Sequence, residues 1–122
     1  MTTMVTLTGA GQPYPAAGRA DAGTLVRCGE TVLQLDTGCA TMLRLAEIEV
    51  TPAALNAVLL THVHSDHVID LPDVAMVRWD KEFPAGPLPV VAPRDAAARY
   101  VSRMFEPFAD DILKLNLWGR VV

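Results

Sequence analysis

The chain has 122 residues, of which 51% are hydrophobic, and its net charge at pH 7 is −4. This length and composition predict a single globular domain. The acidic balance, with a pI near 5.2, argues against a general nucleic-acid-binding surface, although a specific RNA contact stays open. The chain does not start with a basic segment followed by an apolar stretch, and no apolar run approaches membrane-spanning length. We therefore expect a cytoplasmic protein with no membrane partner.

The first third of the chain has the pattern of a small antiparallel sheet followed by a helix. Strand-forming runs alternate with segments rich in Gly, Pro and Ala, and Gly29-Glu30 is a pair suited to a two-residue hairpin turn. Met42, Leu45 and Ile48 then recur at helical spacing. The predicted elements are a strand over 4–8, a loop over 9–23, strands over 23–28 and 31–35, and a helix over 40–48.

The rest of the chain predicts alternating strands and helices. Thr51 is a credible N-cap before Pro52, which suits the first position of a short helix ending at residue 56. The continuous apolar run over 57–60 predicts a strand that is buried on both faces. The later predicted elements are a helix over 71–79, a strand over 88–92, and an amphipathic helix whose apolar stripe is Ala97, Tyr100, Val101, Met104, Phe105 and Phe108.

All three histidines fall in one short window after the predicted buried strand, together with a carboxylate: His62, His64, Asp66 and His67. Alternate residues of an extended segment point the same way, so His62 and His64 can share one metal ion. If a helix begins directly afterwards, Asp66 and His67 lie in its first turn and can hold a second ion. Imidazole with carboxylate suits zinc best, although iron and manganese accept the same set. The spacing therefore predicts two adjacent metal sites; the alternative is a solvated polar loop.

Ser65-Asp66-His67 also contains the residue types of a serine hydrolase triad. Adjacent residues do not easily adopt the mutual geometry that such a triad needs. Moreover, no histidine is left free to act as the base for the serine. We therefore expect metal-assisted rather than serine-based chemistry.

The segment Leu60–His67 resembles the metal-binding motif of the metallo-β-lactamase superfamily, whose domain is a four-layer αββα sandwich of two pseudo-repeated halves. Val32–Gly38 is similar to that family's strand ending in an Asp-x-Gly turn, which implies that Asp36 supports the metal centre from beneath. The alternative is that Asp36 only caps a turn, because Asp-Thr-Gly is a common turn sequence. The fold class implied is α/β (α+β): half of the αββα sandwich, with a mixed β-sheet and flanking helices.

The start of the chain looks most like the ribonuclease Z-type branch of that family, on the segments Val5–Pro13 and Gly23–Val26 and on Arg19. Ser65 departs from the tRNA-processing members, which commonly carry glycine at that position, and is more typical of arylsulfatase-like relatives. The resemblance implies a hydrolase with two zinc ions, in which a metal-activated hydroxide attacks the substrate. Asp66 would be both a metal ligand and the catalytic residue that orients this nucleophile.

Three functions stay open. The first is a ribonuclease Z-like phosphodiesterase, and the second is a lactonase, β-lactamase or arylsulfatase-type hydrolase, because one scaffold hosts several chemistries. The partner in either case is a phosphodiester or small-molecule substrate. The third is an inactive fragment that acts only as an oligomeric or interaction module.

No histidine follows His67, whereas the resemblance implies further ligands from a second half of the fold. We therefore expect residues 1–122 to be the amino-terminal part of a single metallo-β-lactamase-like domain, with 117–122 beginning another apolar element. Half of a sandwich leaves an apolar sheet face exposed. Its expected partner is a second copy of the chain or a missing carboxy-terminal half.

Two further groups of side chains are expected to be structural or solvated. Cys28 and Cys39 flank a predicted strand, which favours buried reduced thiols over a disulfide. Five aspartates are expected to be solvated charges: Asp70, Asp73, Asp80, Asp110 and Asp111.

Overall fold

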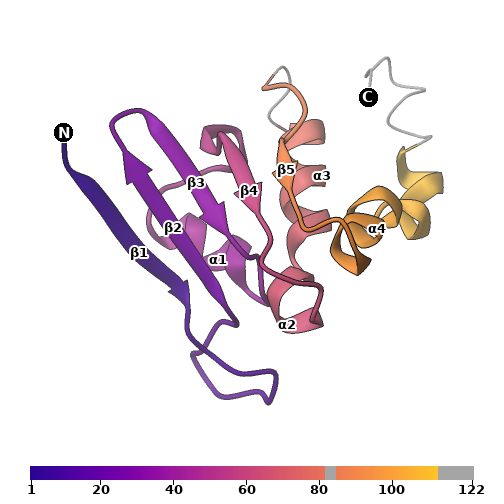
Figure 1. Ribbon diagram of the computed structural model, residues 1–122, viewed down its shortest axis with the longest axis horizontal. Coiled ribbons are helices and arrows are strands. Elements are labelled where there is room, and N and C mark those ends of the chain that lie inside the picture. Colours follow the sequence, from indigo (N-terminus) through magenta and orange to yellow (C-terminus); the bar gives the residue numbers. More distant parts are fainter. Residues whose placement is uncertain (82–84, 113–122) are drawn as a thin grey trace.

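Five strands form one mixed sheet in the order β1-β2-β3-β4-β5 (Figure 1). The first three strands pair antiparallel, whereas β3, β4 and β5 pair parallel. This computed structural model describes residues 1–81 and 85–112, so the apolar element predicted over 117–122 lies outside the described residues. The strands are β1 (Thr3–Gly9), β2 (Gly23–Cys28), β3 (Thr31–Leu35), β4 (Ala57–Leu59) and β5 (Val90–Val91).

The helices gather on one face of this sheet and beyond its β5 edge. Figure 1 shows α1 and α3 behind the strands and α4 beside β5. No helix among the described residues is long and apolar enough to cross a membrane. The helical elements are α1 (Thr41–Glu47), the 3-10 turn η1 (Pro52–Ala54), α2 (Ser65–Val68), α3 (Leu71–Lys81), α4 (Ala96–Arg103) and the 3-10 turn η2 (Glu106–Phe108).

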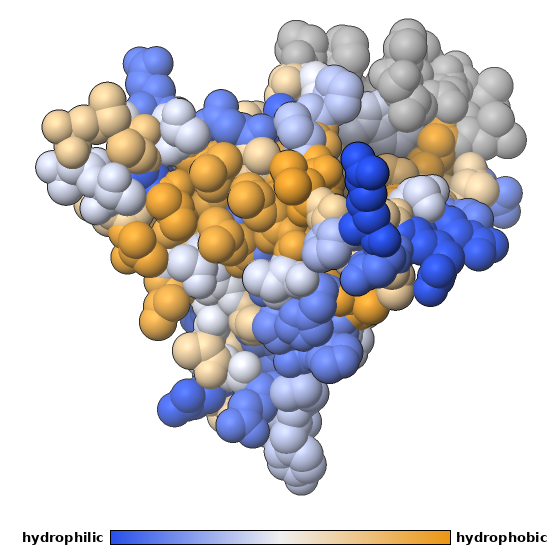
Figure 2. Space-filling model, in the orientation of Figure 1, coloured by the Kyte–Doolittle hydropathy of each residue, from blue (hydrophilic) through white to orange (hydrophobic). Residues whose placement is uncertain are grey.

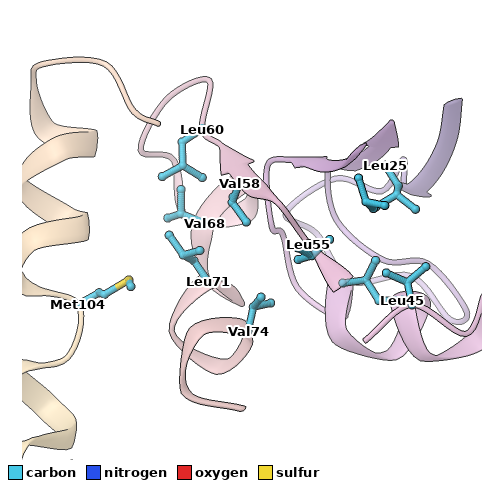
Figure 3. Packing of buried hydrophobic residues seen from close by; sticks show 11 residues of the cluster. Leu25, Leu45, Leu55, Val58, Leu60, Val68, Leu71, Val74 and Met104 are labelled. Atoms are coloured by element: carbon cyan, nitrogen blue, oxygen red, sulfur yellow. The ribbon is translucent and has the colours of Figure 1, made fainter. Parts of the chain in front are cut away.

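The core lies between the sheet and these helices. Strand register places one row of side chains across the sheet on the helix-covered face: Thr6, Leu25, Gln34, Val58 and Val90. Figure 3 shows the buried apolar side chains of β4, α2 and α3 gathered together, with Met104 reaching in from α4. The same row carries two polar side chains: Thr6, on the edge strand, is partly buried, whereas Gln34 is fully buried.

Among the described residues, no helix covers the opposite sheet face, which is mostly apolar. Alternation along the strands places Val5, Val26, Leu33 and Ala57 in one row and Leu7, Thr24, Leu35, Leu59 and Val91 in the next. Leu7 is 69% exposed, Val5 61% and Val91 59%. Figure 2 shows the resulting apolar patch over the strands. The exposed sheet face expected from half of a sandwich is therefore confirmed.

The helix α4 is shorter than the apolar periodicity over residues 97–108 predicts. The helix α4 ends at Arg103, and Pro107 lies in the following 3-10 turn. Proline has no N–H to donate to an i−4 carbonyl and disfavours helical backbone at the residue before it. Phe108, predicted to face the core, is consequently 41% exposed, whereas Ala97 and Met104 of the same predicted stripe are buried.

Other differences from prediction have similarly local causes. The fifth strand was expected over 88–92 but covers only Val90–Val91, because Pro89 cannot donate a ladder hydrogen bond. Ile48 lies beyond the end of α1 and is 39% exposed. The cysteines are free, as expected, but Cys28 is only partly buried and Cys39 is exposed.

A buried arginine side chain, Arg78, joins α3 to two other segments. The Arg78 side chain donates from Nε to Gly86 O at 2.9 Å and from Nη2 to Ala85 O at 3.1 Å. Its Nη1 donates to Pro52 O at 2.9 Å and to Leu55 O at 2.6 Å. The Arg78 guanidinium therefore connects α3 to the η1 turn and to the segment that leads into β5.

Candidate metal centre

The histidine motif begins at the carboxyl end of β4 and runs into α2. Leu60 is buried after the strand, and α2 starts at Ser65, so Asp66 and His67 lie in the first turn of a helix as predicted. The turn after β3 lies against both ends of this segment, because Asp36 N donates to Leu59 O at 2.9 Å and Thr37 N donates to His67 O at 2.7 Å. The start of the motif, at the end of β4, and its last part, in α2, are thereby both held beside the Asp36 turn.

The Asp36 carboxylate accepts hydrogen bonds from Thr61, at the start of the motif, and from His67, at its end. Its Oδ1 accepts from Thr61 N at 2.8 Å, and its Oδ2 accepts from Thr61 Oγ1 at 2.7 Å. The same Oδ2 lies 2.8 Å from His67 Nδ1. Asp36 is 7% exposed, so these contacts are largely shielded from water. Its position beneath the motif agrees with the supporting role that the resemblance implies.

These contacts assign which ring nitrogens carry protons. A carboxylate only accepts, so Thr61 Oγ1 uses its single proton toward Asp36 and accepts from His62 Nδ1, which lies 2.8 Å away. His67 Nδ1 likewise donates to Asp36. In the neutral form of each ring the lone pair therefore lies on Nε2, which is the form that binds a metal.

Each of these Nε2 atoms lies close to the second donor atom of its predicted ligand pair. His62 Nε2 lies 3.1 Å from His64 Nδ1, and His67 Nε2 lies 3.5 Å from Asp66 Oδ2. Two ligand atoms at zinc distances of about 2.1 Å from a tetrahedral ion lie about 3.4 Å apart. Both pairs are therefore spaced as two ligands of one ion are.

The two donor pairs lie side by side. The ring centroids of His62 and His67 are 4.1 Å apart, and those of His62 and His64 are 4.5 Å apart. Among residues 1–81 and 85–112, no group of three or more His, Cys, Asp or Glu side chains is arranged to hold one ion. The motif therefore offers two adjacent pairs of donor atoms, His62 with His64 and Asp66 with His67. A hydrolytic zinc site usually has three protein ligands.

Comparisons with known proteins identify the family of the chain. A family model described as the metallo-β-lactamase superfamily matches residues 22–121. The chain belongs to the metallo-β-lactamase superfamily. Within it, the chain is 42% identical to a ribonuclease Z of Mycolicibacterium gilvum and 43% identical to one of Mycobacterium marinum, each over 110 residues. These matches cover 88% of this chain but only 38% and 39% of the relatives, so the chain spans well under half of their length.

Solved structures show the same fold. The human tRNase Z short form superposes with a TM-score of 0.73 at 22% identity, covering 88% of this chain and 40% of that one. The metallo-β-lactamase fold protein YhfI from Bacillus subtilis gives a TM-score of 0.67 at 30% identity, covering 74% and 37%. The expected fold class, a mixed sheet with flanking helices from this superfamily, is confirmed.

In this metallo-β-lactamase superfamily chain, the short helix α2 is held in place by two other segments, the turn after β3 and the helix α4. In the turn, Gly38 lies so close to α2 that a Cβ would overlap the Asp66 carbonyl oxygen, and Thr37 O accepts from Asp70 N at 3.0 Å. Tyr100 of α4 donates to Val68 O at 3.0 Å, and burial raises the pKa of this phenol.

Asp70 is not the solvated charge that the sequence led us to expect. It is half-buried, and its Oδ2 accepts from Met42 N at 3.0 Å, at the start of α1. That helix follows Ala40, which offers no capping side chain, so Asp70 provides an acceptor for its free N–H groups. Asp80 is also half-buried, whereas Asp73, Asp110 and Asp111 are exposed as predicted.

Burial raises the pKa of the Asp70 carboxyl, and the charge of Asp73 adds to this, while N–H groups of α1 oppose it. An acid whose pKa is higher in the folded state stabilises the fold while protonated, and that contribution is lost as the pH rises through the folded-state pKa. Asp70→Asn keeps an oxygen for Met42 N but does not ionise. Its free energy of unfolding relative to the parent chain should therefore increase between pH 3.5 and pH 6.5.

Urea denaturation at these two pH values measures the difference. Asp110→Asn is the control, because Asp110 is exposed, and its offset from the parent should stay constant. The same constant offset for Asp70→Asn would show that burial does not shift this carboxyl.

Sequence reasoning missed the buried hydrogen bonds of two residues near the motif. Asp70 and Gln34 carry no motif, and both act through contacts with residues 26 or more positions away or across a turn. A signal for Gln34 was present, because an amide in the middle of an apolar strand needs buried hydrogen-bond partners.

Proposed function

We propose that the protein to which this chain belongs is a metal-dependent hydrolase, most like the ribonuclease Z-type phosphodiesterases. In this proposal, residues 1–122 are the amino-terminal part of its catalytic domain. The observation that carries the proposal is the pair of adjacent donor sets, with lone pairs directed by Asp36 and Thr61. The similarity to proteins named ribonuclease Z supports the choice of a phosphodiester of RNA as substrate.

The donor chemistry assigns the ligands. His62 and His64 would hold one cation through Nε2 and Nδ1, and Asp66 and His67 would hold the second through Oδ2 and Nε2. Mixed imidazole and carboxylate donors suit zinc, and iron or manganese are the alternatives. When bound, such cations supply an acidified water and stabilise negative charge that develops on the substrate.

The chain's own residues prepare this chemistry. Asp36 and Thr61 keep the His62 and His67 rings in the metal-binding tautomer, so neither Nε2 has to lose a proton when a ligand bond forms. His64 Nδ1 is the donor in its 3.1 Å contact with His62 Nε2, so its proton would have to move to the other nitrogen of that ring first. The remaining lone pairs of the Asp66 carboxylate would accept a hydrogen bond from the attacking water and orient it. Ser65 is exposed and takes no part.

Metal content tests the ligand assignment. The purified chain, loaded with zinc and freed of excess, is expected to hold two equivalents by elemental analysis. His62→Ala and Asp66→Ala should each lose about one equivalent, whereas the exposed Asp110→Ala should lose none. Unchanged zinc in both ligand variants would remove the basis of the proposal.

Hydrolysis tests the substrate class. Bis(p-nitrophenyl) phosphate, a lactone, a β-lactam and an aryl sulfate are compared with zinc, manganese or iron added to the chain. Preference for the phosphodiester, lost in Asp66→Ala, supports the proposal. Preference for one of the other three substrates would instead favour a lactonase, β-lactamase or arylsulfatase-type hydrolase. The cytoplasmic location expected from the sequence stays a prediction.

A second candidate function rests on the uncovered sheet face and on the count of two protein ligands for each ion. In this case, residues 1–122 act as an oligomeric or interaction module, and the apolar rows of β1 to β5 contact a second copy. Light scattering should then show a dimer or larger species, which Leu7→Lys and Val91→Lys dissociate. A monomer that binds zinc and hydrolyses the phosphodiester would exclude this candidate.

A further inference from the structure

Gln34 is a fully buried amide in the centre of the sheet. Its neighbours in the helix-facing row are Leu25 on β2 and Val58 on β4, both buried and apolar. An apolar side chain would pack at this position without needing hydrogen-bond partners. The Gln34 Oε1 atom has no partner among the described residues. This amide is therefore poorly explained by packing alone.

The other end of the amide makes two short hydrogen bonds, besides a longer one of 3.5 Å to Leu35 O. Gln34 Nε2 donates to Thr8 Oγ1 at 2.9 Å and to the backbone oxygen of Asp36 at 2.9 Å. Gly23 leaves the space for this arrangement, because a Cβ there would overlap Thr8 Oγ1 and lie 2.9 Å from Gln34 Nε2. The amide thus lies between the β1 strand and the turn that carries Asp36.

Asp36 needs such support. Its φ is 55°, in the left-handed region that residues with a Cβ rarely occupy, and its side chain makes the contacts to Thr61 and His67. Asp36 N is held by Leu59 O, and Asp36 O by Gln34 Nε2. With both backbone groups fixed, the carboxylate is aimed at the two histidine rings.

We propose that Gln34 is a positioning residue of the metal centre, which acts by holding the Asp36 turn in its left-handed conformation. The inference rests on the proposed function, because it assumes that the donor pairs bind metal. Gln34 does not contact either donor pair. Its effect passes through the Asp36 carboxylate to the tautomer of His67 and, through Thr61, to that of His62.

The test compares Gln34→Leu with Thr8→Val. Gln34→Leu keeps the size of the side chain but removes both short hydrogen bonds, whereas Thr8→Val leaves the bond to Asp36 in place. The first readout, without metal, is the ring ¹⁵N spectrum, which distinguishes the two neutral tautomers of His67. The second is the zinc dissociation constant, from competition with a chromogenic chelator. Circular dichroism verifies that each variant is folded.

In Gln34→Leu, we expect the His67 tautomer with a proton on Nδ1 to lose population and zinc affinity to fall about tenfold, as for other residues that orient ligands. Thr8→Val should change the affinity less than threefold. If Gln34→Leu does not fold, Gln34→Met replaces it. A folded variant with the parent's ring spectrum and zinc affinity would overturn the inference. Absence of zinc binding by the parent would instead count against the proposed function, while the ring spectrum would still report on Gln34.

Discussion

Asp36→Asn is expected to weaken zinc binding at both donor pairs, by about 10- to 100-fold at each. Three donors converge on this carboxylate: the Thr61 N–H, the Thr61 hydroxyl and the His67 Nδ1–H. An asparagine offers one oxygen and one NH₂ group, so at least one of these donors would face another donor. The His67 ring is then free to adopt the other tautomer, in which Nε2 carries a proton and does not bind a metal.

The number of donor pairs affected distinguishes Asp36→Asn from the loss of a ligand. His62→Ala or Asp66→Ala removes one donor pair, whereas Asp36→Asn affects the second pair through His67 and the first through Thr61 and His62. Isothermal titration with zinc resolves the two affinities. Asp73→Asn is the control, because Asp73 is exposed on α3 and no hydrogen bond from its side chain joins it to the motif. Weakening confined to one site would show that Asp36 supports only His67.

The sequence was informative where structure is decided locally. The hairpin of β2 and β3 has the predicted bounds, because Gly29, with φ of 58°, adopts the conformation that its turn requires. The metal motif was equally accessible, since its four donors lie within six consecutive residues, at the end of a buried strand. Periodicity predicted that His62 lies beside His64 and Asp66 beside His67, and the distances of 3.1 Å and 3.5 Å between their side-chain atoms agree with this placement.

Features that depend on distant contacts were not accessible in this way. Asp36 was assigned its role by resemblance, since an Asp-Thr-Gly turn is common in loops. Asp70 was expected in solvent, because nothing near it in sequence reveals that α1 begins beside it without a capping residue. The apolar period over 97–108 overestimated α4, because a period reports which face is apolar and not where the backbone must change direction at Pro107.

Arg78→Met is expected to lower the free energy of unfolding by about 3 kcal/mol, the largest stability effect that we predict. Methionine retains the apolar length of the side chain but none of its donors. The carbonyl oxygens of Pro52 and Leu55 would then be left without the guanidinium in a buried region, and the contacts with Ala85 and Gly86 would also be lost. A buried acceptor that loses its partner costs about 1–3 kcal/mol.

Arg103→Met is the matched control for this substitution. Arg103 is also at the carboxyl-terminal part of a helix, but its ion pair with Glu106, at 3.0 Å, is exposed on both sides. Exposed ion pairs contribute about 0–1 kcal/mol, so this variant should unfold at nearly the urea concentration of the parent. An equal and small shift in both variants would show that water replaces the guanidinium at the four carbonyl groups. A large shift in Arg78→Met alone would show that the guanidinium joins α3 to the segments that lead into β4 and β5.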